Sequence, residues 1–300
     1  MSLWSFLGLL LAGLTGAGVL LVWFFPTLTD FHAQNPFWNG LDDFRNEFQA
    51  VSLGSLESLP SDPEGSVLLV IPYSSFAEQD LAELNAYLEG GGILILSDDY
   101  GNGNMVLEAL GVSTRFHGVP LVDPLVNYRT PHFPVADDLA PSALTVGVSA
   151  LALNYATALR GEGMTVVARS SPFSYLDGNN NGTRDNNELA GPFPVAGHLK
   201  VGKGHLFVLA DPSIFVNTML AAEDNRHFVT NLINSAGPRP RLLLDQAHLS
   251  PSRLDSVKAA LGSIQRQVSR PLLLAALIAI ITVLLLAPLW RGKGARLGPS

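Results

Sequence analysis

Two long uncharged apolar segments lie near the two ends of this 300-residue chain and limit what the rest can become. The first covers residues 3–25, and as a helix its 23 residues would extend about 34 Å. That length is enough to cross a bilayer core of about 30 Å. The second segment covers residues 271–290 and is followed by a tail, 291–300, that carries three basic residues and no acidic one. The pattern predicts two transmembrane helices.

The charges next to these segments predict an orientation in the membrane. Basic residues beside a span favour the cytoplasm, so we expect the tail to be cytoplasmic. Two spans then place both termini in the cytoplasm and the main domain outside it, as a two-pass protein of the cell membrane. A cleaved signal peptide is the alternative for the first segment, and a buried core helix is the alternative for the second. The expected regions are an anchor (1–29), an extracytoplasmic domain (30–250), a connecting helix (251–270), the second span (271–290) and the tail (291–300).

Composition excludes several classes of protein. The chain has no cysteine, which excludes disulfides, thiolate metal sites and a cysteine nucleophile. Its formal net charge of −8 argues against a nucleic-acid partner, because such proteins usually carry a basic surface. With 47% hydrophobic residues and only 15% charged ones, the chain is not expected to be disordered.

The region between the spans shows the pattern of an α/β domain. Residues 67–71 and 93–96 are short, β-branched apolar runs, as expected of strands buried on both faces. Between them, residues 76–89 have helical apolar spacing with acids near the start, and three glycines at 90–92 end the helix. Strand, helix and strand in this order predict a parallel βαβ unit.

The later segments predict an antiparallel addition to this sheet. Residues 112–170 contain short β-rich runs among many Pro and Gly, which indicates an antiparallel excursion or an extension of the sheet. Residues 197–210 read as a hairpin that turns at Lys203 and Gly204. A helix over 224–234, a final strand over 241–245 and a helix over 252–269 complete the expected order.

The strongest local motif is a calcium loop at residues 177–188, which match the pattern D-x-[DN]-x-[DN]-G-x5-E in full. In this pattern alternate side chains, one backbone carbonyl and a final carboxylate supply oxygen ligands, while a glycine permits the sharp turn. The predicted Ca²⁺ ligands are Asp177, Asn179, Asn181, Thr183, Asp185 and Glu188. We expect a structural site with an affinity of about 10⁻⁴ to 10⁻³ M. The alternative is a solvated, Asn-rich surface turn.

A second group of polar residues follows the apolar strands, where open α/β sheets bind ligands. The ligand-binding candidates are Tyr73, Ser74, Asp98, Asp99, Asn217, Asp224 and Asn225. Asp245 and His248 are spaced as an acid–base pair, which leaves open a hydrolase with Asp211 as the orienting residue. Asp and Asn after strands are also ordinary caps and turn formers, and Asp224 is most simply the N-cap of a helix.

Several of these segments resemble a known family. The residues are 35–44, 67–89 with its three glycines, 94–98, 209–217, the pair Asp224-Asn225, and Asp245-Gln-Ala-His248. They are similar to a family of uncharacterised membrane proteins known as domain of unknown function 4350. That family more often has Asp-Glu-Tyr-His-His in its last segment, so Gln246 and Ala247 depart from its pattern.

The resemblance implies a flavodoxin-like, three-layer domain similar to class I glutamine amidotransferases and to gliding-motility auxiliary proteins of ABC transporters. Amidotransferases of this class use a cysteine nucleophile after a strand, and this chain has none. We therefore expect a membrane-anchored binding or scaffold module, stabilised by Ca²⁺, without amidotransferase activity. The alternatives are the Asp245/His248 hydrolase and an accessory subunit of an ABC-type transporter.

Overall fold

The computed structural model describes residues 3–268, and their contacts divide the chain into two units. Among the described residues, one unit joins 3–25 to 253–268, and the other is Pro26–Ser252. In the first unit the described helices are α1 (Leu3–Phe24) and α6 (Arg253–Val268). The expected second span at 271–290 and the tail at 291–300 lie outside the described residues.

Helix α1 has the length and composition of a membrane-crossing helix. It contains no charged residue, and its apolar stretch from Phe6 to Phe24 is entirely unburied. Within residues 3–268 it is the one helix long and apolar enough to cross a bilayer. A membrane span and a signal sequence both fit these features.

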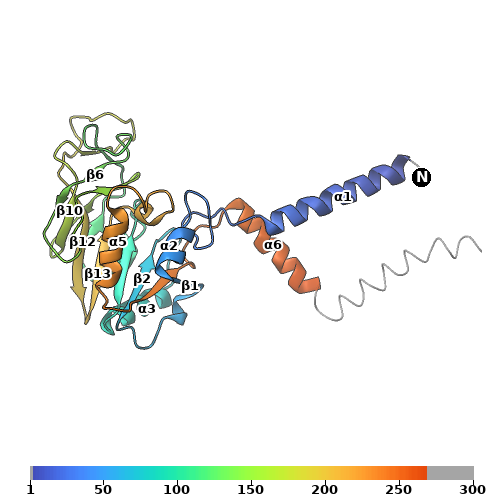
Figure 1. The fold of residues 1–300 in the computed structure, drawn as a ribbon, viewed down its shortest axis with the longest axis horizontal. Coiled ribbons are helices and arrows are strands. Elements are labelled where there is room, and N and C mark those ends of the chain that lie inside the picture. Colours follow the sequence, from blue (N-terminus) through green and yellow to red (C-terminus); the bar gives the residue numbers. More distant parts are fainter. Residues whose placement is uncertain (1–2, 269–300) are drawn as a thin grey trace, which may run out of the picture. The chain divides into compact units, whose positions relative to one another are not determined.

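The second unit is built on one eight-stranded sheet, drawn in Figure 1. Across the sheet the strands are β1 (Val51–Leu53), β14 (Arg241–Asp245), β2 (Ser66–Val70), β3 (Ile93–Ser97), β13 (Gly204–Leu209), β12 (Pro194–Val201), β10 (Thr165–Arg169) and β7 (Asp138–Leu139). The first five run parallel, and the last three continue antiparallel. Every residue of β2 and β3 is buried, which explains their unbroken apolar runs.

The remaining elements surround this sheet. The helices are α2 (Asp42–Phe48), α3 (Glu78–Glu89), α4 (Asn104–Ala109) and α5 (Asn225–Asn234), with 3-10 helices η1 (Leu56–Ser58) and η2 (Pro212–Phe215). Between α4 and β12 the chain forms short strands paired in three small sheets: β4 (Arg115–Phe116) with β9 (Leu159–Arg160), β5 (Leu121–Val122) with β11 (Tyr175–Leu176), and β6 (Val135–Ala136) with β8 (Leu151–Ala152). The expected excursion and the expected extension of the main sheet are therefore both present.

The parallel strands are connected in two directions. From β2 through α3 to β3, and on to β13, the chain moves one way across the sheet. From β13 through α5 it returns to β14, which lies between β1 and β2. Because such crossovers are right-handed, α3 and α5 cover opposite faces. In chain order the parallel strands lie 1-5-2-3-4, which differs from the flavodoxin order 2-1-3-4-5. The expected mixed α/β sheet is confirmed, whereas its order is not that of flavodoxin.

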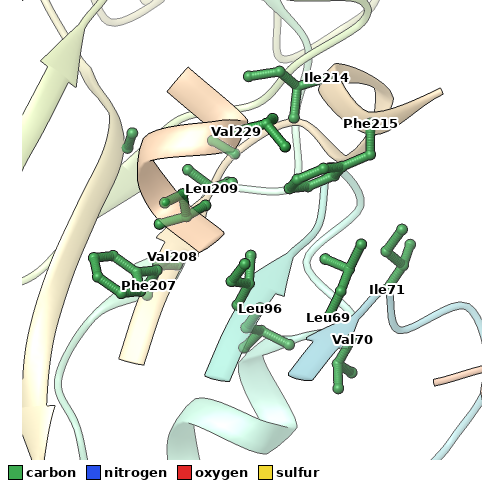
Figure 2. Packing of buried hydrophobic residues seen from close by; sticks show 14 of the residues in the cluster. Leu69, Val70, Ile71, Leu96, Phe207, Val208, Leu209, Ile214, Phe215 and Val229 are labelled. Carbon is green, nitrogen blue, oxygen red and sulfur yellow. The ribbon is translucent and has the colours of Figure 1, made fainter. Parts of the chain in front are cut away.

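The core lies between this sheet and its covering helices. Figure 2 shows Phe215 of η2 and Val229 of α5 directed toward Leu96 on β3 and Leu209 on β13. The ring of Phe215, fully buried, also meets Phe44 of α2 edge-on at 5.4 Å between ring centroids. This packing fixes η2, and hence the chain that follows β13, against the sheet.

Candidate functional site

The carboxyl ends of the parallel strands bring most of the predicted polar residues to one edge of the sheet. Ser97 pairs with Leu209 at the ends of β3 and β13, so the residues that follow these strands are neighbours. The chain leaves β3 toward α4 and leaves β13 toward α5, in opposite directions across the sheet. Ligands of open α/β sheets bind at such a switch point. We call Tyr73, Asp98, Asp99, Tyr100 and Asp211 the edge cluster.

Two carboxylates of the edge cluster, those of Asp98 and Asp211, accept hydrogen bonds from backbone N–H groups. Asp98 accepts hydrogen bonds from the backbone N–H groups of Gly103 (2.7 Å) and Tyr100 (2.9 Å). Asp211 accepts from the N–H groups of Ser213 and Asn154, both at 2.7 Å, and so caps η2. Burial raises the pKa of Asp98, and burial raises the pKa of Asp211 to about 7. Both side chains therefore hold the local backbone in place, and both keep their protons to a higher pH than an exposed carboxyl does.

Asp99 differs from these neighbours because part of its carboxylate has no partner. Its Oδ1 atom is buried and accepts no hydrogen bond, while the Tyr73 hydroxyl bonds to the carboxylate. Burial, followed by the charges of Asp211 and Asp98, raises the pKa of Asp99 to about 8. Among the described residues, Lys and Arg form their ion pairs with other carboxylates, at Asp42, Glu47 and Asp255. Among residues 3–268, no basic side chain pairs with the edge cluster, so the charge that its acids carry once they ionise is not neutralised.

Aromatic rings border these carboxylates. Tyr73 stacks on Phe31 at 5.3 Å between ring centroids and meets Tyr100 edge-on at 5.8 Å. Burial and the charge of Asp99 raise the pKa of Tyr73 well above its usual range, so its hydroxyl stays protonated. Tyr100 is 66% exposed, so one border of the edge cluster is a solvent-accessible aromatic ring. Ser74 is exposed, and its N–H donates to the carbonyl of His248 (2.9 Å).

The predicted pair Asp245 and His248 is in direct contact. The Asp245 Oδ2 atom lies 2.7 Å from Nδ1 of His248, and both side chains are buried. On its other side, Nε2 of His248 faces the carboxylate of Asp80 at 3.4 Å, and the ring stacks flat on Phe76 at 3.7 Å. Burial lowers the pKa of His248, but the bonds and charges of Asp245 and Asp80 outweigh burial and raise it. An imidazole with a carboxylate at each nitrogen has the arrangement of a buried ion pair.

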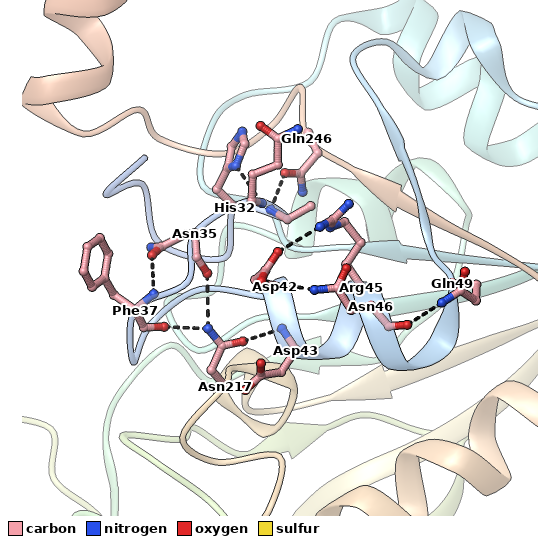
Figure 3. A network of polar contacts seen from close by, with 12 residues as sticks. His32, Asn35, Phe37, Asp42, Asp43, Arg45, Asn46, Gln49, Asn217 and Gln246 are labelled. Atoms are coloured by element: carbon pink, nitrogen blue, oxygen red, sulfur yellow. Dashed lines mark hydrogen bonds and ion pairs between the residues drawn. The ribbon is translucent and has the colours of Figure 1, made fainter. Parts of the chain in front are cut away.

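Two other candidates, Asn217 and Asn225, join distant segments of backbone. Asn217 accepts from Asp43 N–H (2.9 Å) and donates to the carbonyls of Asn35 and Phe37, as Figure 3 shows. Asn225, fully buried, donates to two carbonyls and accepts from the N–H of Ala152. Their polar atoms are thus occupied by the fold.

The expected N-cap position of Asp224 on α5 is confirmed, but its side chain does not cap the helix. It accepts instead from the N–H of Ser149 (2.7 Å), which lies 75 residues away in the segment between α4 and β12. A tertiary partner has replaced the local one.

The predicted calcium loop lies between β11 and β12, and its carboxylates bond to the loop itself. Asp177, fully buried, accepts from the N–H groups of Asn181 and Gly182, and Gly182 takes a positive φ of 73°. Glu188 accepts from the N–H groups of Gly178 (2.9 Å) and Asp185 (3.0 Å).

The side-chain amides of Asn179 and Asn181 both donate to the carboxylate of Asp185. Thr183 bonds to the amide oxygen of Asn181. Oxygen-rich side chains of this kind suit a hard cation. In residues 3–268, however, no three His, Asp or Glu side chains are placed to hold a metal ion.

Sequence reasoning missed the residues that come from distant segments. Asp80 and Phe76 enclose His248, and Phe31 and Asp30 border Tyr73. The only local signal at Asp80 is its place in the first turn of α3, where its carboxylate accepts from Ala77 N–H. That signal indicates a helix cap and says nothing of a histidine 168 residues later.

A family profile described as a domain of unknown function, DUF4350, matches residues 33–233. This chain belongs to the DUF4350 family. The matched part of the DUF4350 domain includes the edge cluster and the calcium loop and ends before β14, so Asp245 and His248 lie beyond it.

Solved structures resemble the DUF4350 domain only distantly. The mmIFT52 N-terminal domain is 16% identical over 56% of this chain and 76% of its own, with a TM-score of 0.44. A ThuA-like protein from Bacteroides uniformis is 13% identical over 61% and 72%, with a TM-score of 0.38. A β-galactosidase from Bacillus circulans sp. alkalophilus is 10% identical over 58% of this chain but 23% of its own, with a TM-score of 0.38. These likenesses carry no conclusion about function. No curated protein sequence matches this chain.

Proposed function

We propose that this protein is a membrane-anchored binding module whose edge cluster receives a cationic group of a partner protein. The observation that carries the proposal is the Asp99 carboxylate, which is half-buried, unneutralised and without a partner at Oδ1. A buried polar atom without a partner costs about 1–3 kcal/mol, and an arriving donor removes that cost. Carboxylates beside tyrosine rings suit an ammonium or guanidinium group, which both kinds of side chain attract.

The test compares two aspartate variants of the full chain, purified from membranes in mild detergent with whatever partner remains bound. Asp99→Asn removes the charge that the proposal needs, whereas Asp62→Asn removes an exposed charge elsewhere. At pH 9, where most of Asp99 is ionised, we expect recovery of the partner to fall at least tenfold for Asp99→Asn and to stay unchanged for Asp62→Asn. Because the pKa of Asp99 is about 8, more of it is ionised as the pH rises, so recovery by the unmodified protein should increase between pH 7 and 9. Equal recovery by both variants contradicts the proposal.

We also propose that both apolar segments are retained as spans, with both termini in the cytoplasm and the DUF4350 domain outside. The absence of cysteine makes single-cysteine labelling unambiguous. A membrane-impermeant maleimide should label Ser61→Cys in intact cells, and Ser300→Cys only after the membrane is permeabilised. The mass of the purified protein should include residues 1–25. Labelling of both positions in intact cells, or loss of the first segment, contradicts this topology.

The calcium loop remains a proposal of its own, supported by its full motif and its oxygen-rich side chains. If Ca²⁺ binds at about 10⁻⁴ to 10⁻³ M, then 10 mM Ca²⁺ adds about 1.4–2.7 kcal/mol to the free energy of unfolding. We expect the midpoint of thermal unfolding to rise by about 3–10 °C. Glu188→Gln should lose most of this rise, while Glu64→Gln, at an exposed site, should keep it. An equal rise in both variants, or none in the unmodified protein, rules out a site at this loop.

The direct contact between Asp245 and His248 favours one second candidate, a hydrolase. A general base needs a free nitrogen toward the substrate, and here Nε2 faces the Asp80 carboxylate. We therefore place binding ahead of hydrolysis. An amidotransferase-like origin of the domain, inferred from resemblance, is compatible with binding because the chain lacks the cysteine nucleophile. Recovery of an ATPase as the Asp99-dependent partner would assign the protein as an accessory subunit of a transporter.

A further inference from the structure

A cavity separate from the edge cluster lies on the antiparallel part of the sheet. Its volume is about 350 Å³, within the range of small-molecule sites. The side chains that line it come from β3, β10, β12, β13 and the loop at 140–144, and they include Ile93, Leu144, Thr165, His198, His205 and Phe207. Most of this lining is apolar. Phe207 lies on β13 beside Val208 and Leu209 (Figure 2).

The strand register places three basic side chains together on one face. In the antiparallel pair of β12 and β13, His198 is opposite Phe207 and Lys200 is opposite His205. Residues opposite each other, and residues two apart, share a face of the sheet. The rings of His198 and His205 are 6.3 Å apart, and His198 stacks on Phe207 at 5.7 Å. None of the described residues that line the cavity is acidic.

The imidazole of His198 is incompletely bonded. Its Nδ1 atom is buried and has no hydrogen-bond partner. Burial lowers the pKa of His198, and the nearby His205 lowers it further. The other charged group on this face is Lys200, and β3, β10, the loop at 140–144 and the end of α5 add no titratable group to the lining. A ligand carboxylate in this cavity would therefore meet no acidic side chain of the described lining. It would instead favour the protonated, positively charged forms of His198 and His205.

The loop that covers the cavity is held in place. Asn231 of α5 donates to the carbonyls of Leu144 (3.0 Å) and Val146 (2.9 Å), and the Ala140 N–H donates to Val167 (2.9 Å). The cavity is thus formed by fixed elements, and a small ligand would not need to order its walls.

We propose that this cavity binds a small molecule with an apolar body and a carboxylate head, and that the head pairs with His198 and His205. The apolar body lies against Leu144, Ile93 and Phe207. The negative head supplies a counter-charge to the protonated imidazoles of His198 and His205, whose ring centroids lie 6.3 Å apart. A neutral molecule of the same shape gains only the apolar contacts.

The test uses the full chain in lipid nanodiscs, with ¹⁵N-labelled histidine and phenylacetate as the probe. We expect saturable shifts of the His198 and His205 ring signals, with binding about tenfold tighter at pH 6 than at pH 8. The neutral analogue 2-phenylethanol should bind at least tenfold more weakly. His198→Gln and the surface variant His205→Gln should each lose about tenfold in affinity, whereas His227→Gln, exposed on α5, should lose none.

Three results would overturn the proposal. One is the absence of shifts at His198 and His205 up to 10 mM phenylacetate, chosen as roughly ten times a millimolar dissociation constant. Another is equal binding of phenylacetate and 2-phenylethanol. The third is unchanged affinity in His205→Gln, a variant at an exposed position that leaves the core intact. None of these results depends on the edge cluster, so they are independent of the partner experiment.

Discussion

Replacement of His248 by leucine is expected to lower the free energy of unfolding by about 3–5 kcal/mol, the usual cost of leaving one member of a buried ion pair alone. The Asp245 carboxylate has no exposed surface and would keep only the N–H of Ala247 as a partner. Leucine retains the contact with Phe76 but supplies no proton to either carboxylate. His248 contacts Asp245 at the end of β14 and Asp80 in the first turn of α3, so its loss weakens two elements together.

Thermal and urea unfolding of the full chain measure this effect. At about 2–4 °C per kcal/mol for a domain of this size, the midpoint should fall by roughly 10 °C. Asp80→Asn is the matched control, because Asp80 is 24% exposed and lies 3.4 Å from the ring, and it should cost about 1 kcal/mol. A His248→Leu protein as stable as the unmodified one would contradict the ion pair.

The same pair gives the protein a pH dependence with a definite sign. The two carboxylates raise the pKa of His248, although burial opposes them, so the folded state holds the proton more tightly than the unfolded state. That contribution is complete below the unfolded pKa of about 6.5 and is lost as the pH rises through the folded pKa. The difference in stability between the unmodified protein and His248→Leu should therefore shrink toward high pH. A difference that grows with pH assigns the effect to another group.

Replacement of Asn225 by aspartate is expected to destabilise the domain by about 3 kcal/mol or more at pH 7. The Asn225 amide donates to the carbonyls of Ala152 and Met219, both at 2.9 Å, and is fully buried. An ionised carboxylate of the same shape donates nothing and faces two carbonyl oxygens. Each buried group left without a partner costs about 1–3 kcal/mol, and more where charge is involved.

The control for this variant is Asn85→Asp, an identical change at an exposed position of α3. It should alter the free energy of unfolding by less than about 0.5 kcal/mol. The Asn225→Asp penalty should fall as the pH drops toward the unfolded Asp pKa of about 3.9, because a protonated carboxyl can again donate one hydrogen bond. If both variants are equally stable, the two hydrogen bonds that Asn225 donates do not hold the fold together. Asn225 is then again a candidate ligand-binding residue.

The local sequence pattern was sufficient to predict the strands whose residues are all buried. Strands β2 and β3 were expected from unbroken apolar runs and agree with the structure to within about one residue at each end. The hairpin of β12 and β13 was also expected, but with its turn at Lys203 and Gly204; Val201 pairs with Gly204, so the turn residues are Gly202 and Lys203. In these cases the residues that decide the structure are neighbours in the chain, so a short window contains the information.

The site is less predictable because its contacts are long-range. The residues after β3 and β13 could be expected at one edge once parallel strands were inferred. The partner of His248 could not, since Asp80 is brought to it only when β14 inserts between β1 and β2. The partner of Asp224 could not be predicted either, because its bond to Ser149 depends on how the segment between α4 and β12 folds against α5.

Residue order thus accounts for the apolar helix at the N-terminal end, the alternation of strands and helices, the calcium-loop motif and the lack of a cysteine nucleophile. These are properties of composition and short spacing. The folded domain alone settles which polar side chains remain free: it occupies Asp98, Asp211, Asn217 and Asn225 with backbone N–H and carbonyl groups and leaves Asp99 incompletely bonded. The reason is physical. A polar side chain is available to a ligand only after every nearby backbone group has found its partner, and those partners come from all parts of the chain.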